Sequence, residues 1–287
     1  MIERVAVLCS DEPHHNYLIG LLESRFRVEL IVREPMKQQR ARALRERRWS
    51  DYFYASYHNL RRTLLGLNSY RQKYFEQAPA GPCGRSCELH VKYINDPQVS
   101  RVLQKTAPDL TIVMSTSILK QDVLQAAGPR IVNIHGGYLP FYRGNHCFFF
   151  ALYNRDFGKI ASTIHFIDSG IDTGDLIELV VPRVRRDDTA EMLYCRAEKM
   201  AIHRLLELME SIRHGGEFPR TPQPFRGTLY RTRDRKIWHD LHSWFRRITG
   251  FQQRLIDEWN RHNIEASRNA ITQPVGVAST TRPSADI

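Results

Sequence analysis

The 287-residue sequence lacks several features that would define its class at once. No apolar stretch approaches the roughly 18 residues that a membrane-spanning helix needs. The apolar run at residues 5–8 is too short for the hydrophobic region of a signal peptide. Five cysteines are an odd and sparse set for a secreted disulfide framework. We therefore expect a cytoplasmic protein with reduced thiols.

Glycine-rich phosphate loops are also missing, because neither GxGxxG nor GxxxxGK[ST] occurs anywhere in the chain. The turn after the first expected strand reads Cys9-Ser10-Asp11-Glu12-Pro13 and carries two acidic residues. A dinucleotide or nucleoside triphosphate cradle is therefore disfavoured.

What the sequence does contain is an alternation of short apolar runs with helix-like stretches. Strands are expected at residues 5–9, 27–32, 110–114, 131–134, 162–167 and 176–184, and helices at 13–22, 120–127 and 189–214. Continuous apolar strands separated by helices are typical of a sheet covered on both faces. The expected fold class is α/β, with a Rossmann-like, doubly wound and mostly parallel sheet.

Positive charge is concentrated in one segment that interrupts this alternation. The formal net charge is +11, and residues 33–73 hold eleven Lys/Arg against three Asp/Glu, a net +8. Six aromatic residues lie in the same segment, and helical spacing runs through it. We interpret residues 33–95 as a basic, aromatic insertion with a solvated helical face, and attraction of an anionic substrate or a membrane surface stays an alternative. RNA binding remains open but is not favoured.

The C-terminal part is expected to differ from the rest. Residues 215–265 predict a mostly helical extension, and residues 266–287 predict a disordered tail. Phe251, Ile256 and Trp259 are expected to pack on the core or on a second subunit, which leaves a homodimer open.

The segment Asn133-Ile-His-Gly-Gly-Tyr-Leu-Pro-Phe-Tyr-Arg-Gly144 carries the clearest chemistry. Strand alternation places Asn133 and His135 on the same side, at the carboxyl end of an expected parallel strand, where open α/β sheets bind ligands. An Asn amide suits a developing oxyanion, and a His titrates near neutral pH. A second strand leads into a loop that presents Asp172 before Thr173-Gly174. A carboxylate beside His135 would orient its ring.

These parts together resemble the folate-dependent formyltransferase superfamily, which includes glycinamide ribonucleotide, methionyl-tRNA and sugar-nucleotide formyltransferases. The shared pattern is Asn-x-His on a strand, a Leu-Pro-x-Tyr-Arg-Gly-like turn, and a strand and loop ending in Asp-x-Gly. All three occur here in order, and the resemblance covers about residues 110–181 closely. One departure is Gly136-Gly137, where the family often has Pro-Ser; we take this pair as a feature of the sugar-modifying branch.

The resemblance implies transfer of a formyl group from 10-formyltetrahydrofolate to a primary amine, without a metal. Asn133 and protonated His135 would stabilise the tetrahedral oxyanion, while Asp172 would orient His135 and help relay the amine proton. The residues implied on the folate side are Ser117, Ile118, Leu119, Asp168 and Gly170. The residues implied on the acceptor side are Gly136, Gly137, Tyr142 and Arg143. Residues 1–214 would then form the catalytic domain.

Other candidate residues receive structural interpretations. Cys83, Cys87 and His90 lack a fourth ligand nearby, so an ordinary loop is preferred over a zinc site. Cys147 lies close in sequence to the expected site but is not taken as a nucleophile. His165 alternates with apolar neighbours on a strand and is taken as structural rather than as a second base.

The acceptor is the least constrained part of the prediction. An amino sugar on a nucleotide comes first, because it suits the Gly-Gly turn and a basic protein facing a diphosphate. Methionyl-tRNA comes second, since the C-terminal part shows no run of short strands like the family's tRNA-binding barrel. Glycinamide ribonucleotide, hydrolysis of the folate without an acceptor, and a catalytically silent nucleic-acid-binding protein stay as alternatives.

Overall fold

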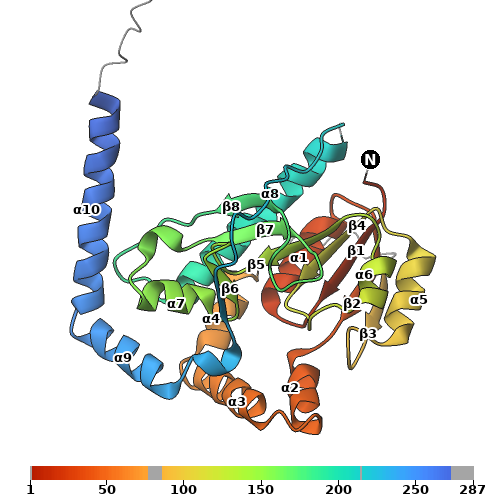
Figure 1. Cartoon of the computed structure of the whole chain (residues 1–287), viewed down its shortest axis with the longest axis horizontal. Helices are drawn as coiled ribbons and strands as arrows, with labels where there is room; N and C mark the ends of the chain where they lie inside the picture. Colours follow the sequence, from red (N-terminus) through yellow and green to blue (C-terminus); the bar gives the residue numbers. More distant parts are fainter. Residues whose placement is uncertain (1, 77–85, 214, 273–287) are drawn as a thin grey trace, which may run out of the picture.

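Seven strands form one sheet in the order β3-β2-β1-β4-β5-β7-β8 in the computed structural model, which describes residues 2–76, 86–213 and 215–272 (Figure 1). The strands are β1 (Val5–Cys9), β2 (Val28–Arg33), β3 (Cys87–His90), β4 (Leu110–Met114), β5 (Ile131–His135), β7 (Ser162–Phe166) and β8 (Leu176–Val180). The first five run parallel, whereas β7 pairs antiparallel with both β5 and β8. The mostly parallel α/β sheet expected from the sequence is confirmed.

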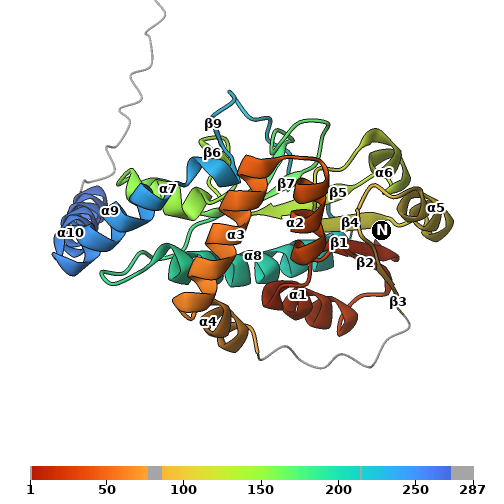
Figure 2. The same cartoon turned by 90° about the horizontal axis from the view of Figure 1, so that it is seen from below.

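Helices cover both faces of this sheet (Figure 2). α1 (Pro13–Glu23) and α8 (Ala190–Arg213) pack on one face, and α5 (Pro97–Thr106) and α6 (Gln121–Ala126) pack on the other. Strand β1 shows why, because its alternate residues join opposite cores: Val5 and Val7 face α1 and α8, whereas Ala6 and Leu8 face α5 and α6.

The helix boundaries follow local signals in the sequence. Pro13 and Pro97 occupy the first turns of α1 and α5, where a missing N–H costs nothing. The Asp96 side chain caps α5 by accepting a hydrogen bond from the Gln98 N–H at 2.9 Å. These signals fix the first residue of each helix, and so they define the loops at the carboxyl ends of the preceding strands.

A separate small sheet links the middle of the chain to its C-terminal part. β6 (Tyr142–Gly144) pairs in parallel with β9 (Thr228–Tyr230). α7 (Cys147–Tyr153) and the short helix η1 (Phe157–Lys159) follow β6 and form a third apolar cluster with α8. The turn after β5 is therefore held by residues nearly ninety positions further along the chain.

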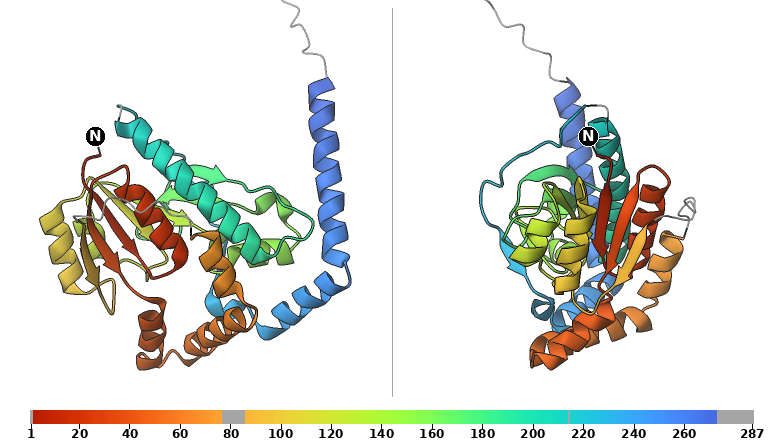
Figure 3. Two further views of the ribbon diagram at one scale, coloured as in Figure 1. Left: turned by 180° about the vertical axis from the view of Figure 1, so that it is seen from behind. Right: turned by 90° about the vertical axis from the view of Figure 1, so that its right-hand side faces the viewer.

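The basic insertion folds as three helices, α2 (Met36–Arg45), α3 (Trp49–Leu64) and α4 (Leu67–Tyr74). The C-terminal extension holds η2 (Thr232–Asp234), α9 (Ile237–Ile248) and α10 (Phe251–Thr272). α3 packs against η2, so the insertion and the extension meet at one end of the molecule (Figure 3). No helix in the described ranges is both long and apolar enough to cross a membrane.

Several elements differ from the sequence expectation. Residues 87–90, expected in a loop, form the edge strand β3 because their backbone pairs with β2. The strand expected to reach residue 184 ends at Val180. The helical part of the extension expected at 215–265 is divided into α9 and α10 by Gly250, which has a φ of +69°. α10 continues to Thr272, past residue 266 where the tail was expected to begin, and residues 273–287 lie outside the described ranges.

Candidate active site

Strand β5 carries Asn133 and His135 to the carboxyl edge of the sheet, where Asn133 faces His165 on β7. The Asn133 Nδ2 amide donates to His165 Nε2 at 3.0 Å, and His165 Nδ1 donates to the Phe166 carbonyl at 2.7 Å. These partners define a neutral His165, and burial lowers its pKa to about 4. His165 therefore fixes the orientation of the Asn133 amide, whose second N–H is not committed by this bond.

His135 is held at one ring nitrogen. Its Nε2 donates to the Tyr142 carbonyl at 3.0 Å, since a carbonyl can only accept. Gly137 makes this arrangement possible, because a Cβ at that position would lie 2.5 Å from His135 Nε2 and 2.6 Å from the Tyr142 oxygen. Gly136 is confined as well, since a Cβ there would lie 2.9 Å from the Tyr194 ring. Both glycines act through packing in this structure.

Asp172 reaches the same site from the loop after β7. Its Oδ2 accepts the Gly144 N–H at 2.8 Å and lies 3.6 Å from His135 Nδ1. Its Oδ1 lies 3.8 Å from His165 Nε2. Burial by itself would raise the pKa of the Asp172 carboxyl, but His135, His165 and the Gly144 N–H outweigh it, so the pKa is lowered. The structure thus brings Asn133, His135 and Asp172 together around one point.

The backbone of Asp172 is unusual, since its φ of +52° lies in the left-handed region that non-glycine residues seldom adopt. Arg143 holds the preceding residue in place by donating from Nε and Nη2 to the Ile171 carbonyl, at 3.0 and 2.6 Å. The bidentate contact fixes the loop and so the position of the carboxylate.

Tyr142 and Arg143, which were expected on the acceptor side, make internal contacts in the structure. Arg143 is buried and is engaged by the Ile171 and Gly227 carbonyls. Tyr142 is also buried, and its hydroxyl donates to Asp156 at 3.1 Å. Both side chains make internal contacts, and both residues lie on β6, whose pairing with β9 was not predicted from the sequence.

The expected folate-side residues lie in two loops. Asp168 accepts hydrogen bonds from the Gly170 N–H and the Thr173 hydroxyl, so these residues form a closed turn that supports the Asp172 loop. At the end of β4, the Ser117 N–H donates to Glu34 at 2.8 Å and so has an internal partner. Leu119 is buried, whereas the Ile118 side chain is 63% exposed and can contact a ligand.

Sequence reasoning missed a charged network beside the site. Arg62 and Arg71 both donate to Glu12, each at 2.9 Å, and Arg71 also donates to Glu191 at 2.8 Å. Glu12 was visible as a polar residue after a buried strand, but its partners Arg62 and Arg71 lie 50 and 59 positions away. This network anchors the insertion helices to the carboxyl edge of the sheet.

The remaining candidates contribute no reactive group. The Cys147 Sγ lies 3.7 Å from His135 Nε2, but burial raises the pKa of its thiol well above the usual range, so it stays protonated. Cys87 is exposed on β3, and Cys83 lies outside the described residues. Within the described ranges, no group of three or more His, Cys, Asp or Glu side chains is arranged to hold a metal.

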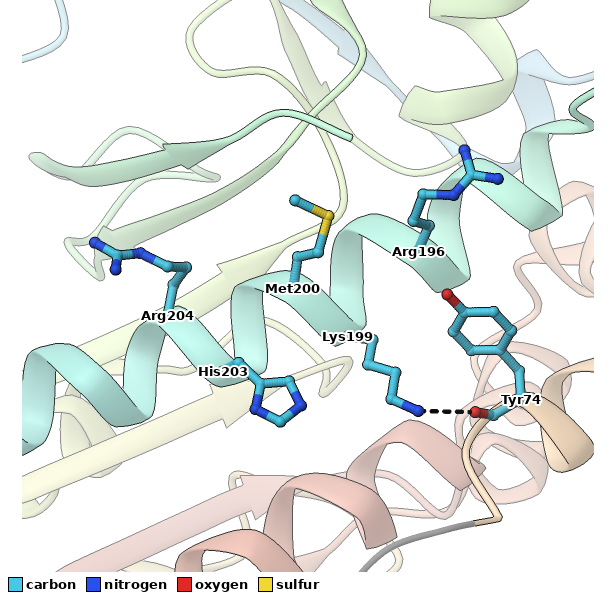
Figure 4. A pocket seen from close by; sticks show the side chains of 6 residues that line it. All are labelled: Tyr74, Arg196, Lys199, Met200, His203 and Arg204. Carbon is cyan, nitrogen blue, oxygen red and sulfur yellow. Dashed lines mark hydrogen bonds between the residues drawn. The ribbon is translucent and has the colours of Figure 1, made fainter. Parts of the chain in front are cut away.

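An open hollow on α8 lies apart from these residues (Figure 4). It is lined by Tyr74, Arg196, Lys199, Met200, His203 and Arg204. Lys199 donates to the Tyr74 carbonyl across it at 3.3 Å. None of its lining residues was expected in the site or contacts Asn133, His135 or Asp172 through a hydrogen bond or ion pair described above.

Comparison with known proteins adds to this geometry. A family model described as formyl transferase matches residues 60–209, just over half of the chain. Methionyl-tRNA formyltransferase of Methylacidiphilum infernorum is 34% identical over 191 residues, which cover 66% of this chain and 54% of that protein. The enzyme of the same name from Anaeromyxobacter dehalogenans is 30% identical over 144 residues, covering 50% and 46%. The chain thus spans about half the length of these curated relatives.

Solved structures share the fold at low sequence identity. A 4-N formyltransferase from Francisella tularensis aligns with a TM-score of 0.51 and 15% identity, covering 80% of this chain and 76% of that one. A sugar N-formyltransferase from Shewanella aligns with a TM-score of 0.51 and 13% identity, covering 81% and 78%. These likenesses concern the fold alone.

Proposed function

The chain belongs to the formyl transferase family, and we propose that it moves a formyl group from 10-formyltetrahydrofolate to the primary amine of a small phosphorylated acceptor. The first candidate acceptor is an amino sugar carried on a nucleotide. The observation that supports the proposal most is the approach of Asp172 Oδ2 to His135 Nδ1 at 3.6 Å, beside the Asn133 amide.

His135, Asn133 and Asp172 have separate roles in the transfer. The acceptor nitrogen attacks the formyl carbon, its proton is lost, the bond from that carbon to the folate nitrogen breaks, and the folate nitrogen takes up a proton. His135 Nε2 is tied to Tyr142, so Nδ1 is the ring atom that serves the reacting groups. The second N–H of Asn133 and the proton on His135 Nδ1 stabilise the developing oxyanion. Asp172 keeps the imidazolium in place and receives or passes the amine proton.

The donor is held by the loops that follow β4 and β7. Ile118 offers an exposed apolar surface at the end of β4, and the Asp168–Gly170 turn forms the opposite wall. Free cysteines at positions 9, 87, 147 and 195 and a folate donor fit a cytoplasmic site of action.

Methionyl-tRNA is the second candidate acceptor, supported by the names of the sequence relatives. Against it, the described residues after α8 contain one three-residue strand, two helices and a short 3-10 helix rather than a multi-stranded barrel. An acceptor smaller than tRNA is therefore preferred. Glycinamide ribonucleotide is the third candidate, because it also presents a primary amine on a phosphorylated scaffold.

The test is a panel assay with the purified chain and 10-formyltetrahydrofolate. Nucleotide-linked amino sugars, glycinamide ribonucleotide and methionyl-tRNA are supplied separately, and mass spectrometry reads the gain of one formyl group on each. Formylation of a nucleotide-linked amino sugar is expected. Formylation of methionyl-tRNA alone would overturn the acceptor choice. Formate release without any acceptor, and no transfer to any amine, would point to a hydrolase.

A further inference from the structure

A group of basic side chains at the insertion borders the site described above. We call it the cationic cluster and define it as His58, Arg61, Arg62, His146 and Arg235. α3 supplies the first three residues, the residue before α7 supplies His146, and the loop before α9 supplies Arg235. The rings of His58 and His146 lie 4.5 Å apart, which places the insertion against the start of α7.

The cluster contains most of the unpaired buried polar atoms in the described residues. Eight buried side-chain nitrogen or oxygen atoms there have no hydrogen-bond partner, and five of them belong to the cluster. These five are both ring nitrogens of His58, Nε2 of His146, and Nε of Arg61 and Arg62. His58 is 5% exposed. Unpaired buried polar atoms are costly, and at least three of these five are donors: the Arg61 and Arg62 Nε–H groups and one ring nitrogen of neutral His58. Their concentration in one place indicates a site for a hydrogen-bond acceptor.

Positive charge is also incompletely balanced within the cluster. Arg61 and Arg235 share one carboxylate, that of Asp240, at 3.6 and 3.1 Å. Burial, followed by Arg61, lowers the pKa of Arg235 to about 10. Burial and the neighbouring guanidinium groups lower the pKa of His58 to about 4 and hold that of His146 well below its usual range. An anion placed here would relieve the repulsion between the guanidinium groups.

The cluster adjoins the reacting groups along the chain. His146 follows Gly144 by two residues, and the Gly144 N–H binds Asp172. The next residue is Cys147, whose Sγ lies 3.7 Å from His135 Nε2. Only a few residues of backbone at the start of α7 therefore separate the cluster from the groups around His135 and Asp172.

We propose that the cationic cluster is the subsite that binds the phosphate or diphosphate group of the acceptor, so that the insertion selects phosphorylated amines. That the ligand is the formyl acceptor rests on the proposed function, whereas the phosphate site itself does not. A phosphate presents oxygens in several directions, which suits donors that arrive from three segments of the chain. A flat carboxylate would engage only part of this set.

The first test measures binding of inorganic pyrophosphate by titration calorimetry, with acetate as the comparison anion. His58→Phe keeps the ring packing and removes both nitrogens, and Arg61→Met keeps the aliphatic stem. Each is expected to weaken pyrophosphate binding about tenfold or more. Arg45→Met, an exposed arginine on α2 in the same insertion, is the control and should bind as the unaltered chain does. Acetate should bind far more weakly than pyrophosphate.

Thermal unfolding separates a binding role from a structural one. His58→Phe removes two unpaired nitrogens, so the variant should unfold at the same or a higher temperature than the unaltered chain without pyrophosphate. Pyrophosphate should raise the unfolding temperature of the unaltered chain and not that of the variant. A variant that is less stable yet still gains stability from pyrophosphate would overturn the proposal.

Equal pyrophosphate binding by the unaltered chain and all three variants would also overturn the proposal. So would a loss of binding in Arg45→Met as large as in the two cluster variants, since only overall charge would then matter. With an identified acceptor, the two cluster variants should raise KM for that acceptor with little change in kcat. An unchanged KM would count against the subsite even if transfer occurs. Conversely, cluster-dependent pyrophosphate binding in a chain that formylates no amine would retain the subsite and reject the proposed function.

One further arm distinguishes the source of the phosphate. UDP and a short hairpin RNA are titrated separately, each with and without pyrophosphate. UDP binding that pyrophosphate displaces supports the proposal. RNA binding that pyrophosphate leaves intact, with a steep dependence on salt and none on His58, would assign the basic surface to nucleic acid instead.

Discussion

The formyl-transfer centre and the cationic cluster are neighbours that satisfy their polar groups in opposite ways. In the centre, Asn133 is bonded to His165, His135 to the Tyr142 carbonyl, and Asp172 to the Gly144 N–H. In the cluster, five buried nitrogens have no partner within the described residues. The polar groups of the centre are thus paired within the protein, whereas we propose that those of the cluster pair with an anion. On this proposal, the groups that orient the reacting atoms and the groups that bind the acceptor lie in separate parts of the molecule.

The largest effect is expected from Asp172→Asn, because the amide cannot stabilise the His135 imidazolium or take a proton. The kcat/KM for formyl transfer should fall about 100-fold or more, and His135→Ala should do the same. Initial rates with 10-formyltetrahydrofolate and the identified acceptor measure this.

Asp175→Asn is the matched control, because Asp175 lies three residues away and pairs only distantly with Arg220, at 3.7 Å. It should keep near-normal rates. Circular dichroism must show that all variants are folded. Near-normal turnover in Asp172→Asn would mean that the centre has been assigned wrongly.

The proximity of Asn133, His135 and Asp172 could be predicted from the sequence, because these residues come from two adjacent strands and the loop that follows one of them. Strand alternation puts Asn133 and His135 on one side, and the pairing of β5 with β7 brings the Asp172 loop to the same edge. The strands themselves were equally readable, since β1 and β4 are buried throughout and therefore apolar throughout. Local sequence patterns were sufficient to predict contacts between elements that are neighbours in the sheet.

The cationic cluster could not be predicted in this way. His58, His146 and Arg235 are separated by nearly ninety residues each, and no local pattern links them. The internal contact of Arg143 could not be predicted for the same reason, because its partner Ile171 depends on how two loops meet. β3 was missed because it is an exposed edge strand, so its residues show no apolar alternation. The composition of the insertion showed where the positive charge is concentrated, but it did not show which residues from other segments lie against it.

Gly137→Ala should break the centre through packing rather than chemistry. The new Cβ would lie 2.5 Å from His135 Nε2 and 2.7 Å from the Cys147 Cβ, so the ring must move. We expect a loss of about 1–3 kcal/mol in the free energy of unfolding, together with most of the activity. Urea denaturation measures the first quantity.

Gly158→Ala is the matched control, since a Cβ there meets no atom within 4 Å. It should change neither stability nor turnover appreciably. Equal losses in the two variants would show that the tight space around Gly137 is not what constrains His135.

Acid should destabilise both regions through their buried histidines. The pKa of His165 in the centre and that of His58 in the cluster are each lowered by burial to about 4, below the unfolded value near 6.5. The unfolded chain therefore binds more protons between pH 6.5 and 4, and stability falls as the pH is lowered through this window. At pH 5 each histidine contributes roughly 1–2 kcal/mol of this loss.

The lowered pKa of Asp172 acts only below its usual value near 3.8, outside this window. Urea denaturation at pH 7 and pH 5 measures the loss, and His58→Phe should reduce it. A loss that His58→Phe leaves unchanged would show that this histidine is not held neutral by its surroundings. Added pyrophosphate should protect the unaltered chain more than the variant, which links the acid response to the cluster.

The smallest effect is expected from Cys147→Ser, at the residue where the centre and the cluster meet. The thiol is buried, its pKa is raised well above the usual range by that burial, and its Sγ lies 3.7 Å from His135 Nε2. A protonated thiol is a poor nucleophile, and a hydroxyl fills nearly the same space. Turnover should stay within about threefold of the unaltered chain, and iodoacetamide should not inactivate the native enzyme through this residue. A loss of transfer in Cys147→Ser comparable to that in Asp172→Asn would place the sulfur in the reaction, and the centre would then need a covalent step.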